Sequence, residues 1–204
     1  MMIKNHIHGY TKDSFCDCPG FIAPVIYVYG CNLRCNFCHN KSFSYIQPKE
    51  NIPFDWDIIE DDIKGKIGWY EAIVVSGGEV TIIPGIAEKL KELKDYFGLP
   101  IKIDTNGLLP TVISELLDND IVSWVAIDIK HVWNKYKDVV GVDIDAEDVE
   151  DCFNSNFYTA LKHPGKISFR TTLIPEIDEN YKQMIRDQVP SMFDIIFQKY
   201  IERK

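Results

Sequence analysis

Three cysteines, Cys31, Cys35 and Cys38, lie within the stretch YGCNLRCNFCHN. Thiolates are soft ligands that suit zinc and iron–sulfur clusters. A four-iron cluster held by three thiolates leaves one iron without a protein ligand, so a small molecule can bind there, as at the open position of a catalytic metal site. A simple electron carrier would show a fourth cysteine at a recognisable spacing. The spacing therefore favours a cluster with one open position.

A structural zinc site is the alternative interpretation of these cysteines. Such a site needs four closed ligands, and the available pairing joins Cys16 and Cys18 with Cys35 and Cys38. This pairing leaves Cys31 without a role. We expect Cys16 and Cys18 to be free thiols rather than a redox pair or auxiliary ligands, because CxC closes too small a loop for an easy disulfide.

The elements that must position the cysteines alternate between strand and helix. Six β-branched or aromatic segments predict strands, at 24–30, 71–78, 99–107, 123–130, 166–175 and 193–200. Apolar spacing and charge order predict helices between them, at 84–98, 109–119, 145–163 and 178–189. This alternation predicts an α/β protein whose parallel sheet is covered by helices, either open or curled into part of a barrel.

Polar residues gather where the predicted strands end. SGGE (76–79), DTNG (104–107) and DIK (128–130) end the second, third and fourth strands, and Arg170 lies in the fifth. The cysteines follow the first strand directly. Because ligand sites lie at the carboxyl ends of parallel strands, we expect all five segments to meet at one rim.

The cysteine spacing in CNLRCNFC resembles the signature of the radical S-adenosylmethionine (SAM) superfamily, and the resemblance covers nearly the whole chain. It implies a partial (β/α)6 TIM-type barrel of parallel strands with outer helices. It also implies a [4Fe-4S] cluster on Cys31, Cys35 and Cys38, with SAM chelating the open iron. In such enzymes one electron cleaves SAM to methionine and a 5′-deoxyadenosyl radical, which abstracts hydrogen.

The same resemblance assigns further residues to SAM. Phe37 matches the aromatic residue that family members place beside the adenine. Gly77, Gly78 and Glu79 resemble the GGE element that meets the methionine amino group, since paired glycines allow close backbone approach and a carboxylate complements an ammonium. The family usually continues this element with proline, whereas this chain has Val80.

Residues beyond the cysteines narrow the resemblance to the glycyl-radical enzyme activases. CHN at 38–40 and CPG at 18–20, where relatives often have YPG, are similar to that subgroup, as are DTNG and DIK. The subgroup takes a hydrogen from one backbone glycine of a large partner enzyme. A glycyl-radical enzyme as protein substrate and a flavodoxin- or ferredoxin-like electron donor are therefore the implied partners.

Six residues at the later strand ends are expected to bind SAM or its neighbours: Asp104, Thr105, Asn106, Asp128, Lys130 and Arg170. In the pyruvate formate-lyase activase of this subgroup, the positions matching Asp104, Thr105 and Asp128 help hold a monovalent cation against the SAM carboxylate. The electrostatic reason is that two carboxylates beside a third would repel without a cation. For Arg170 the alternative is an ion pair in the barrel wall.

Within the subgroup, the short chain and its DSFCDCPG opening look most like the anaerobic ribonucleoside-triphosphate reductase activating proteins. This makes the expected activity that of a radical SAM oxidoreductase. Three alternatives remain open. They are a pyruvate formate-lyase-type activase, a compact radical SAM enzyme acting on a small molecule, such as 7-carboxy-7-deazaguanine synthase, and a non-enzymatic iron–sulfur or zinc protein.

The composition limits the domain number, the partners and the location that can be expected. With 204 residues, 46% of them apolar, one domain over 1–204 is expected, with an N-terminal extension at 1–23 and the barrel at 24–204. A net charge of −9 argues against nucleic acid as a partner. The sequence shows neither a membrane-length apolar run nor a signal peptide, so we expect a cytoplasmic protein. Cys152, Trp124 and Trp133 are expected to serve packing.

Overall fold

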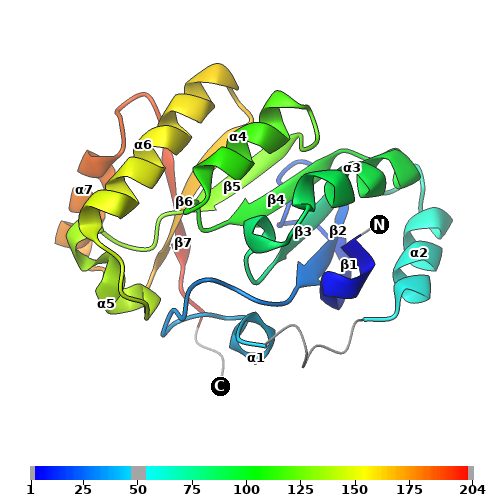
Figure 1. Ribbon diagram of the computed structural model, residues 1–204, viewed down its shortest axis with the longest axis horizontal. Coiled ribbons are helices and arrows are strands. Elements are labelled where there is room, and N and C mark those ends of the chain that lie inside the picture. The colour runs from blue at the N-terminus through cyan, green and yellow to red at the C-terminus, as the bar shows by residue number, and fades with distance from the viewer. Residues whose placement is uncertain (1–2, 47–53, 202–204) are drawn as a thin grey trace.

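The computed structural model describes residues 3–46 and 54–201, and within them seven strands form one sheet (Figure 1). Neighbours in the sheet are also neighbours in the sequence, β1 to β7, which is the winding of a barrel wall. Strands β2 to β7 are parallel, and β1 is antiparallel to β2. The strands are β1 (Ile7–Ser14), β2 (Ala23–Val28), β3 (Ile73–Gly77), β4 (Ile101–Thr105), β5 (Trp124–Asp128), β6 (Ile167–Leu173) and β7 (Ile195–Lys199).

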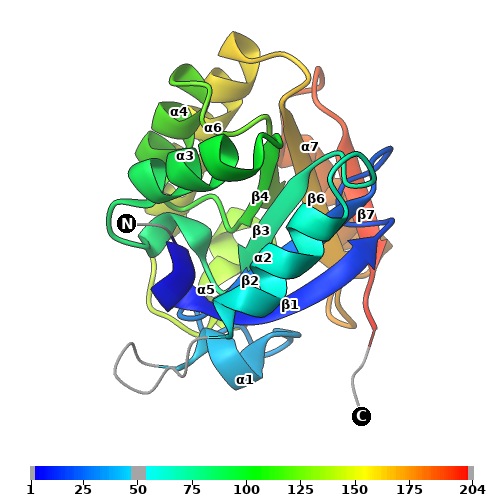
Figure 2. The same ribbon diagram turned by 90° about the vertical axis from the view of Figure 1, so that its right-hand side faces the viewer.

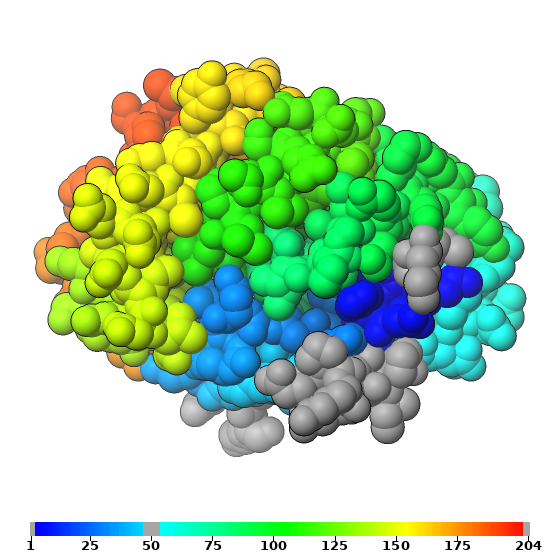
Figure 3. Space-filling view, viewed as in Figure 1, coloured from blue at the N-terminus to red at the C-terminus, as the bar shows by residue number. Residues whose placement is uncertain are grey.

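Helices follow most of the strands and cover one face of the sheet (Figures 1 and 2). Figure 3 shows α6, α4 and α3 side by side on this face. The α-helices are α1 (Lys41–Ser44), α2 (Trp56–Gly65), α3 (Ile86–Phe97), α4 (Pro110–Asp118), α5 (Tyr136–Val140), α6 (Ala146–Lys162) and α7 (Glu179–Gln188). No described helix is long and apolar enough to cross a membrane.

The predicted α/β class is confirmed, with all six predicted strands and all four predicted helices in place. The six parallel strands and their outer helices form a partial TIM-type barrel. Local sequence signals bound two of the helices: Gly98 ends α3 in the left-handed conformation, and the Asp178 side chain accepts the N–H of Tyr181 at the start of α7.

Two larger elements were not predicted. The segment 1–23, expected only as an extension, contains β1, which pairs along β2 and begins at the fully buried Ile7. Its sequence, IHGYTKDS, lacks regular alternation, and its pairing is interrupted by irregularities near both ends. The other element is α2, whose N-cap Asp55 accepts the N–H of Asp57.

The alternation of side chains along the strands gives the sheet two different faces. Large apolar residues of one face, such as Ile26, Ile73 and Ile103, pack against the helices in the main core. The other face is the barrel interior, where Val25 and Val74 belong to a small apolar cluster. Polar side chains occupy the rest of the interior, and these build the site.

The residues expected to serve packing do so to different degrees. Trp133 is buried and stacks on Phe153 with ring centroids 4.7 Å apart. Trp124 is half-buried and packs on Phe21. Cys152 lies at the edge of the core rather than inside it, because it is half-buried on α6.

Candidate active site

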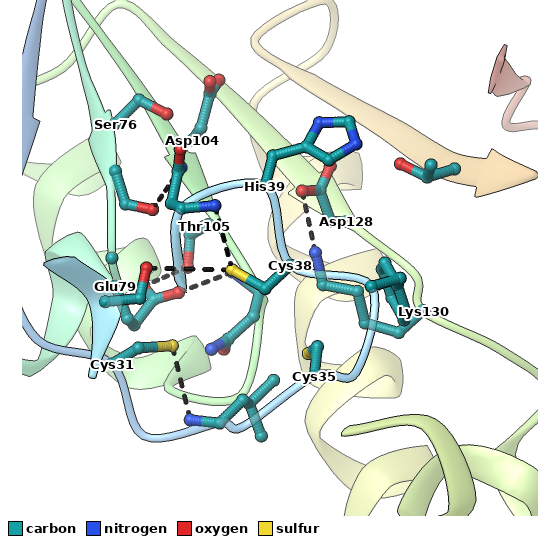
Figure 4. A pocket seen from close by; sticks show the side chains of 18 of the residues that line it. Cys31, Cys35, Cys38, His39, Ser76, Glu79, Asp104, Thr105, Asp128 and Lys130 are labelled. Carbon is teal, nitrogen blue, oxygen red and sulfur yellow. Dashed lines mark hydrogen bonds and ion pairs between the residues drawn. The ribbon is translucent and has the colours of Figure 1, made fainter. Parts of the chain in front are cut away.

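A cavity at the carboxyl ends of the parallel strands is the candidate active site (Figure 4). The loop after β2 and the ends of strands β3 to β7 supply its walls. Every residue predicted for the site lines this cavity: Cys31, Cys35, Phe37, Cys38, Gly77, Gly78, Glu79, Asp104, Thr105, Asn106, Asp128, Lys130 and Arg170. The roles of these residues toward SAM stay predictions, whereas their convergence is a feature of the fold.

Several lining residues were not predicted, among them Leu33, Ser44, Thr172 and Gln198. A signal was available for Thr172, because it lies two residues after Arg170 on β6 and so shares its face of the sheet. Gln198 comes from β7, so the last strand of the barrel reaches the same cavity as the cysteine loop.

The cysteine loop is anchored to the end of α5. The N–H groups of Arg34 and Asn36 donate to the carbonyls of Val140 (2.7 Å) and Val139 (3.3 Å). Gly141 follows with a φ of 68°, and a Cβ there would lie 2.4 Å from the Arg34 carbonyl oxygen. Glycine at 141 therefore permits this close approach between the helix end and the loop.

Arg34 organises the loop from within, a role that sequence reasoning missed. Its guanidinium donates to the carbonyls of Cys31 (2.6 Å) and Leu33 (2.7 Å). The same group lies over the ring of Tyr45, whose hydroxyl donates to the carbonyl of Cys35 at 2.8 Å. The Arg34–Tyr45 pair thus holds the backbone of two predicted cluster ligands.

The thiols face the cavity with backbone donors beside two of them (Figure 4). The N–H of Leu33 donates to the Cys31 sulfur and the N–H of Asn40 to the Cys38 sulfur, both at 3.3 Å. Burial raises the pKa of Cys31 to about 11, although the Leu33 N–H opposes this rise. Burial likewise raises the pKa of Cys35. These thiols become thiolates when a metal cluster replaces their protons.

The glycine pair brings the end of β3 against the end of β2. Gly77 has a φ of 118°, and a Cβ on Gly78 would lie 1.8 Å from the carbonyl oxygen of Gly30. The N–H of Gly78 donates to Val28 and that of Glu79 to Gly30, both at 2.8 Å. The close backbone approach expected for SAM is thus also required by the fold itself, just before the first cysteine.

Glu79 is buried and accepts hydrogen bonds from two directions. Its Oε1 accepts the hydroxyls of Thr81 and Thr105, both at 2.6 Å, and the N–H of Thr81 at 3.1 Å. Its Oε2 accepts the N–H of Asn106 at 2.7 Å, and the Asn106 side chain donates to Asn32 in the cysteine loop. This network fixes the carboxylate and ties β4 to that loop.

Five charged side chains form a chain of ion pairs across the barrel interior, which we call the barrel network: Lys102, Asp104, Arg170, Asp128 and Lys130. Lys102 pairs with Asp104, and Arg170 lies 3.4 Å from the same carboxylate. Arg170 also lies 2.9 Å from Asp128, whose other oxygen is 3.0 Å from Lys130. Burial opposes charge on Asp128 and Lys130, but pairing outweighs it, so the pKa of Asp128 is lowered and that of Lys130 raised. The alternative role considered for Arg170, an ion pair in the barrel wall, is therefore present, and this pair lies at the wall of the cavity.

Further contacts join the cysteine loop to β3 and to the end of β7 at the cavity. The ring of His39 stacks on Tyr200, which directly follows β7, with centroids 5.5 Å apart. The Asn40 side chain donates to the carbonyl of Gly77 at 2.8 Å. The HN dipeptide after the third cysteine therefore connects the cysteine loop to β3 and to the end of β7.

The zinc pairing is excluded by geometry. Cys16 and Cys18 precede β2, whereas Cys35 and Cys38 follow it, so the length of β2, about 20 Å at 3.3 Å per residue, separates the pairs. Cys18 is buried in the small apolar cluster of the interior. None of the six cysteines forms a disulfide, whereas freedom of Cys16 and Cys18 from metal stays a prediction.

Comparison with known proteins agrees with this geometry. The model of the radical SAM superfamily matches residues 25–187. A Methanocaldococcus jannaschii protein named glycyl-radical enzyme activating enzyme is 33% identical over 86% of this chain and 71% of its own length. The pyruvate formate-lyase-activating enzyme of Clostridium pasteurianum is 26% identical over 91% of this chain and 75% of its own.

Solved structures share the fold. Streptococcus suis SuiB bound to S-adenosylmethionine superposes with a TM-score of 0.62 at 17% identity, over 88% of this chain and 40% of SuiB. This chain thus spans well under half of SuiB. QueE from Escherichia coli superposes with a TM-score of 0.51 at 16% identity, over 95% of this chain and 93% of its own.

The chain belongs to the radical SAM superfamily and is a radical SAM enzyme. Its relatives are named glycyl-radical enzyme activating enzyme and pyruvate formate-lyase-activating enzyme. The family implies a [4Fe-4S] cluster and SAM. The residues present fit the cluster, because three sulfur donors line one cavity and two of them already accept backbone N–H groups.

Proposed function

We propose that this protein activates a glycyl-radical enzyme, most specifically an anaerobic ribonucleotide reductase, by taking one hydrogen atom from a glycine α-carbon. When bound, the cluster supplies the electron that cleaves SAM to methionine and a 5′-deoxyadenosyl radical. The hydrogen then moves from the glycine to the 5′ carbon, leaving a glycyl radical and 5′-deoxyadenosine. A flavodoxin- or ferredoxin-like protein donates the electron, and the reaction takes place in the cytoplasm.

One observation carries the proposal: the CHN-bearing cysteine loop, Glu79, the DTNG element and DIK all line a single cavity. Cys31, Cys35 and Cys38 hold the cluster in it. Glu79 would meet the SAM amino group, and Phe37 would pack on the adenine. The choice of a protein substrate is supported by the similarity to relatives that are named activating enzymes.

The residues of this chain orient the reactants rather than react themselves. Arg34 and Tyr45 fix the cysteine loop, and the Glu79 network fixes the carboxylate before SAM arrives. Lys130 and Arg170 present cationic groups to the SAM carboxylate. A radical reaction depends on such fixed positions, because the reacting atoms must be held close together and away from water.

The proposed activation of a glycyl-radical enzyme is tested in the absence of oxygen. The reconstituted protein, SAM and dithionite are mixed with an anaerobic ribonucleotide reductase, and the glycyl radical is sought by electron paramagnetic resonance. We expect the radical together with release of 5′-deoxyadenosine. SAM cleavage without a radical on this reductase, but with one on pyruvate formate-lyase, would reassign the partner. Cleavage with no radical on either enzyme would contradict the activase proposal.

Matched cysteine variants test the ligand set. Cys35→Ala is expected to abolish both the iron–sulfur absorbance and SAM cleavage, because a three-thiolate cluster has no ligand to spare. Cys152→Ala removes a half-buried thiol that does not line the cavity and is expected to keep both properties. If Cys16→Ala proved as damaging as Cys35→Ala, the ligand assignment would be wrong.

A further inference from the structure

A lysine lies buried inside the barrel, and its neighbours across the sheet are uncharged. Lys102 is on β4, and its side chain is only 6% exposed. Its neighbours across the sheet are Val74 on β3 and Trp124 on β5, which offer no charge to it. Burying an ammonium among such groups is costly unless a counter-charge lies within reach.

The counter-charge is Asp104, two residues further along the same strand. Strand alternation puts both side chains on the interior face, where the Lys102 ammonium pairs with Asp104 Oδ1. A terminal nitrogen of Arg170 lies 3.4 Å from the same oxygen. Asp104 is therefore engaged by two protein cations at the wall of the cavity.

The other predicted cation ligands are engaged as well. Asp128 has Arg170 at 2.9 Å from one oxygen and Lys130 at 3.0 Å from the other. The Thr105 hydroxyl donates to Glu79 at 2.6 Å and accepts the N–H of Gly107. The family-implied monovalent cation thus does not fit Asp104, Thr105 and Asp128 as they stand.

The charges of the barrel network explain how the site can work without that ion. Its three cations face two carboxylates, so the network carries a net charge of +1. A SAM carboxylate bound beside it would bring the total to zero. Without Lys102, the two aspartates and the SAM carboxylate would outnumber the two remaining cations, which is the repulsion that an external cation would relieve.

We infer that the Lys102 ammonium takes the place of a monovalent metal ion, so that this protein binds and cleaves SAM without Na+ or K+. Lys102 is a positioning residue here, acting on SAM through Asp104 and Arg170. The inference rests on the proposed use of SAM at this cavity and specifies the ions that the site requires.

The experiment compares ions on the reconstituted holoprotein. SAM affinity is measured by isothermal titration calorimetry in buffers whose monovalent cation is tetramethylammonium, Na+ or K+, at equal ionic strength. We expect the wild-type Kd to change by less than about twofold among the three. For Lys102→Met we expect binding about tenfold weaker in tetramethylammonium, with Na+ or K+ restoring most of the loss.

Two controls keep the outcome clear. Lys91→Met removes a lysine paired with Asp95 on the exposed side of α3 and should behave as wild type in every buffer. The line width of 23Na resonance reports bound Na+ directly, and broadening is expected with Lys102→Met but not with wild type. Should Lys102→Met fail to fold, the wild-type measurements alone decide.

Wild-type protein that binds SAM only with Na+ or K+, or that broadens the 23Na resonance, would overturn the inference while leaving the proposed function intact. Absence of SAM binding in all three buffers would overturn the proposed use of SAM, and the inference with it.

Discussion

Two regions of this molecule bury carboxylates among cations, and they do so to different ends. One is the barrel network described above. The other, here called the hairpin network, joins β1 to α2 and consists of Asp62, Tyr10, Tyr70, Lys66 and Asp13. Asp62 accepts the hydroxyls of Tyr10 (2.8 Å) and Tyr70 (2.7 Å), and Lys66 lies 2.7 Å from Asp13 and 3.3 Å from Asp62.

The partners of the two networks mark the difference. Asp62 receives neutral hydroxyls on one oxygen and lysines on the other, all from the structural elements packed around it. The barrel network is mostly cations, and four of its five members line the cavity: Asp104, Asp128, Lys130 and Arg170. Burial and pairing alone therefore do not identify a site. A network that lines a cavity with four of its members and holds one more cation than carboxylates does identify a site, because it leaves capacity for an anionic ligand.

Among the substitutions that distinguish the two networks, Arg170→Met is expected to have the largest effect. The change removes the group that bridges Asp104 and Asp128, and so leaves both carboxylates under-compensated beside the SAM carboxylate. We expect the rate of SAM cleavage to fall by about a hundredfold or more, measured as 5′-deoxyadenosine released per cluster. The exposed-site variant Lys91→Met serves as control. A fall of less than about threefold would leave Arg170 with a structural role alone.

A smaller effect, on a different property, is expected from Asp62→Asn. Asparagine keeps the size of the side chain but loses the charge that pairs with Lys12 and Lys66. We expect the free energy of unfolding to fall by about 2 kcal/mol, measured by urea denaturation. SAM cleavage per folded enzyme should remain within about twofold of wild type. Lost cleavage with unchanged stability would remove the distinction between the networks.

The smallest effect is a dependence on pH. Burial opposes the ionisation of Asp62, but the tyrosine hydroxyls and the two lysines outweigh it and hold its pKa at about 2, against an ordinary 3.8. A lowered carboxyl pKa stabilises the fold above the ordinary value, and this contribution is lost as the pH falls toward the folded value. The stability difference between wild type and Asp62→Asn should therefore shrink between about pH 4 and pH 2. A constant difference across that range would contradict the assigned cause.

Much of this molecule could be predicted because its signals are local. Each parallel strand is a short apolar run, and β3, β4 and β5 end at Gly77, Thr105 and Asp128. The rule that sites lie at carboxyl ends then places SGGE, DTNG and DIK together. The cysteine spacing is a local signal as well. These two facts suffice to predict thirteen residues that line the cavity, but not Leu33, Ser44, Thr172 or Gln198.

What could not be predicted depends on contacts between distant segments. Lys102 was expected on a strand, but its pairing needs the barrel to close around Asp104 and Arg170. The sequence does not distinguish Arg34 from the other charged residues, and only the structure shows that its guanidinium donates to carbonyls of the cysteine loop. Strand β1 was missed because its stability comes from pairing with β2 rather than from its own alternation.

The order of the strands has a consequence for how the protein is made. Each strand pairs with the one synthesised just before it, so the wall can form unit by unit as the chain emerges. The cysteine loop is synthesised early, yet Gln198 and Tyr200, which border it, come after every other strand has formed. Until then the cavity around the thiols is incomplete, and the thiols are exposed to oxygen and to free metal ions. Insertion of the cluster is therefore expected to follow translation rather than accompany it, and air admitted during synthesis should do more harm than air admitted afterwards.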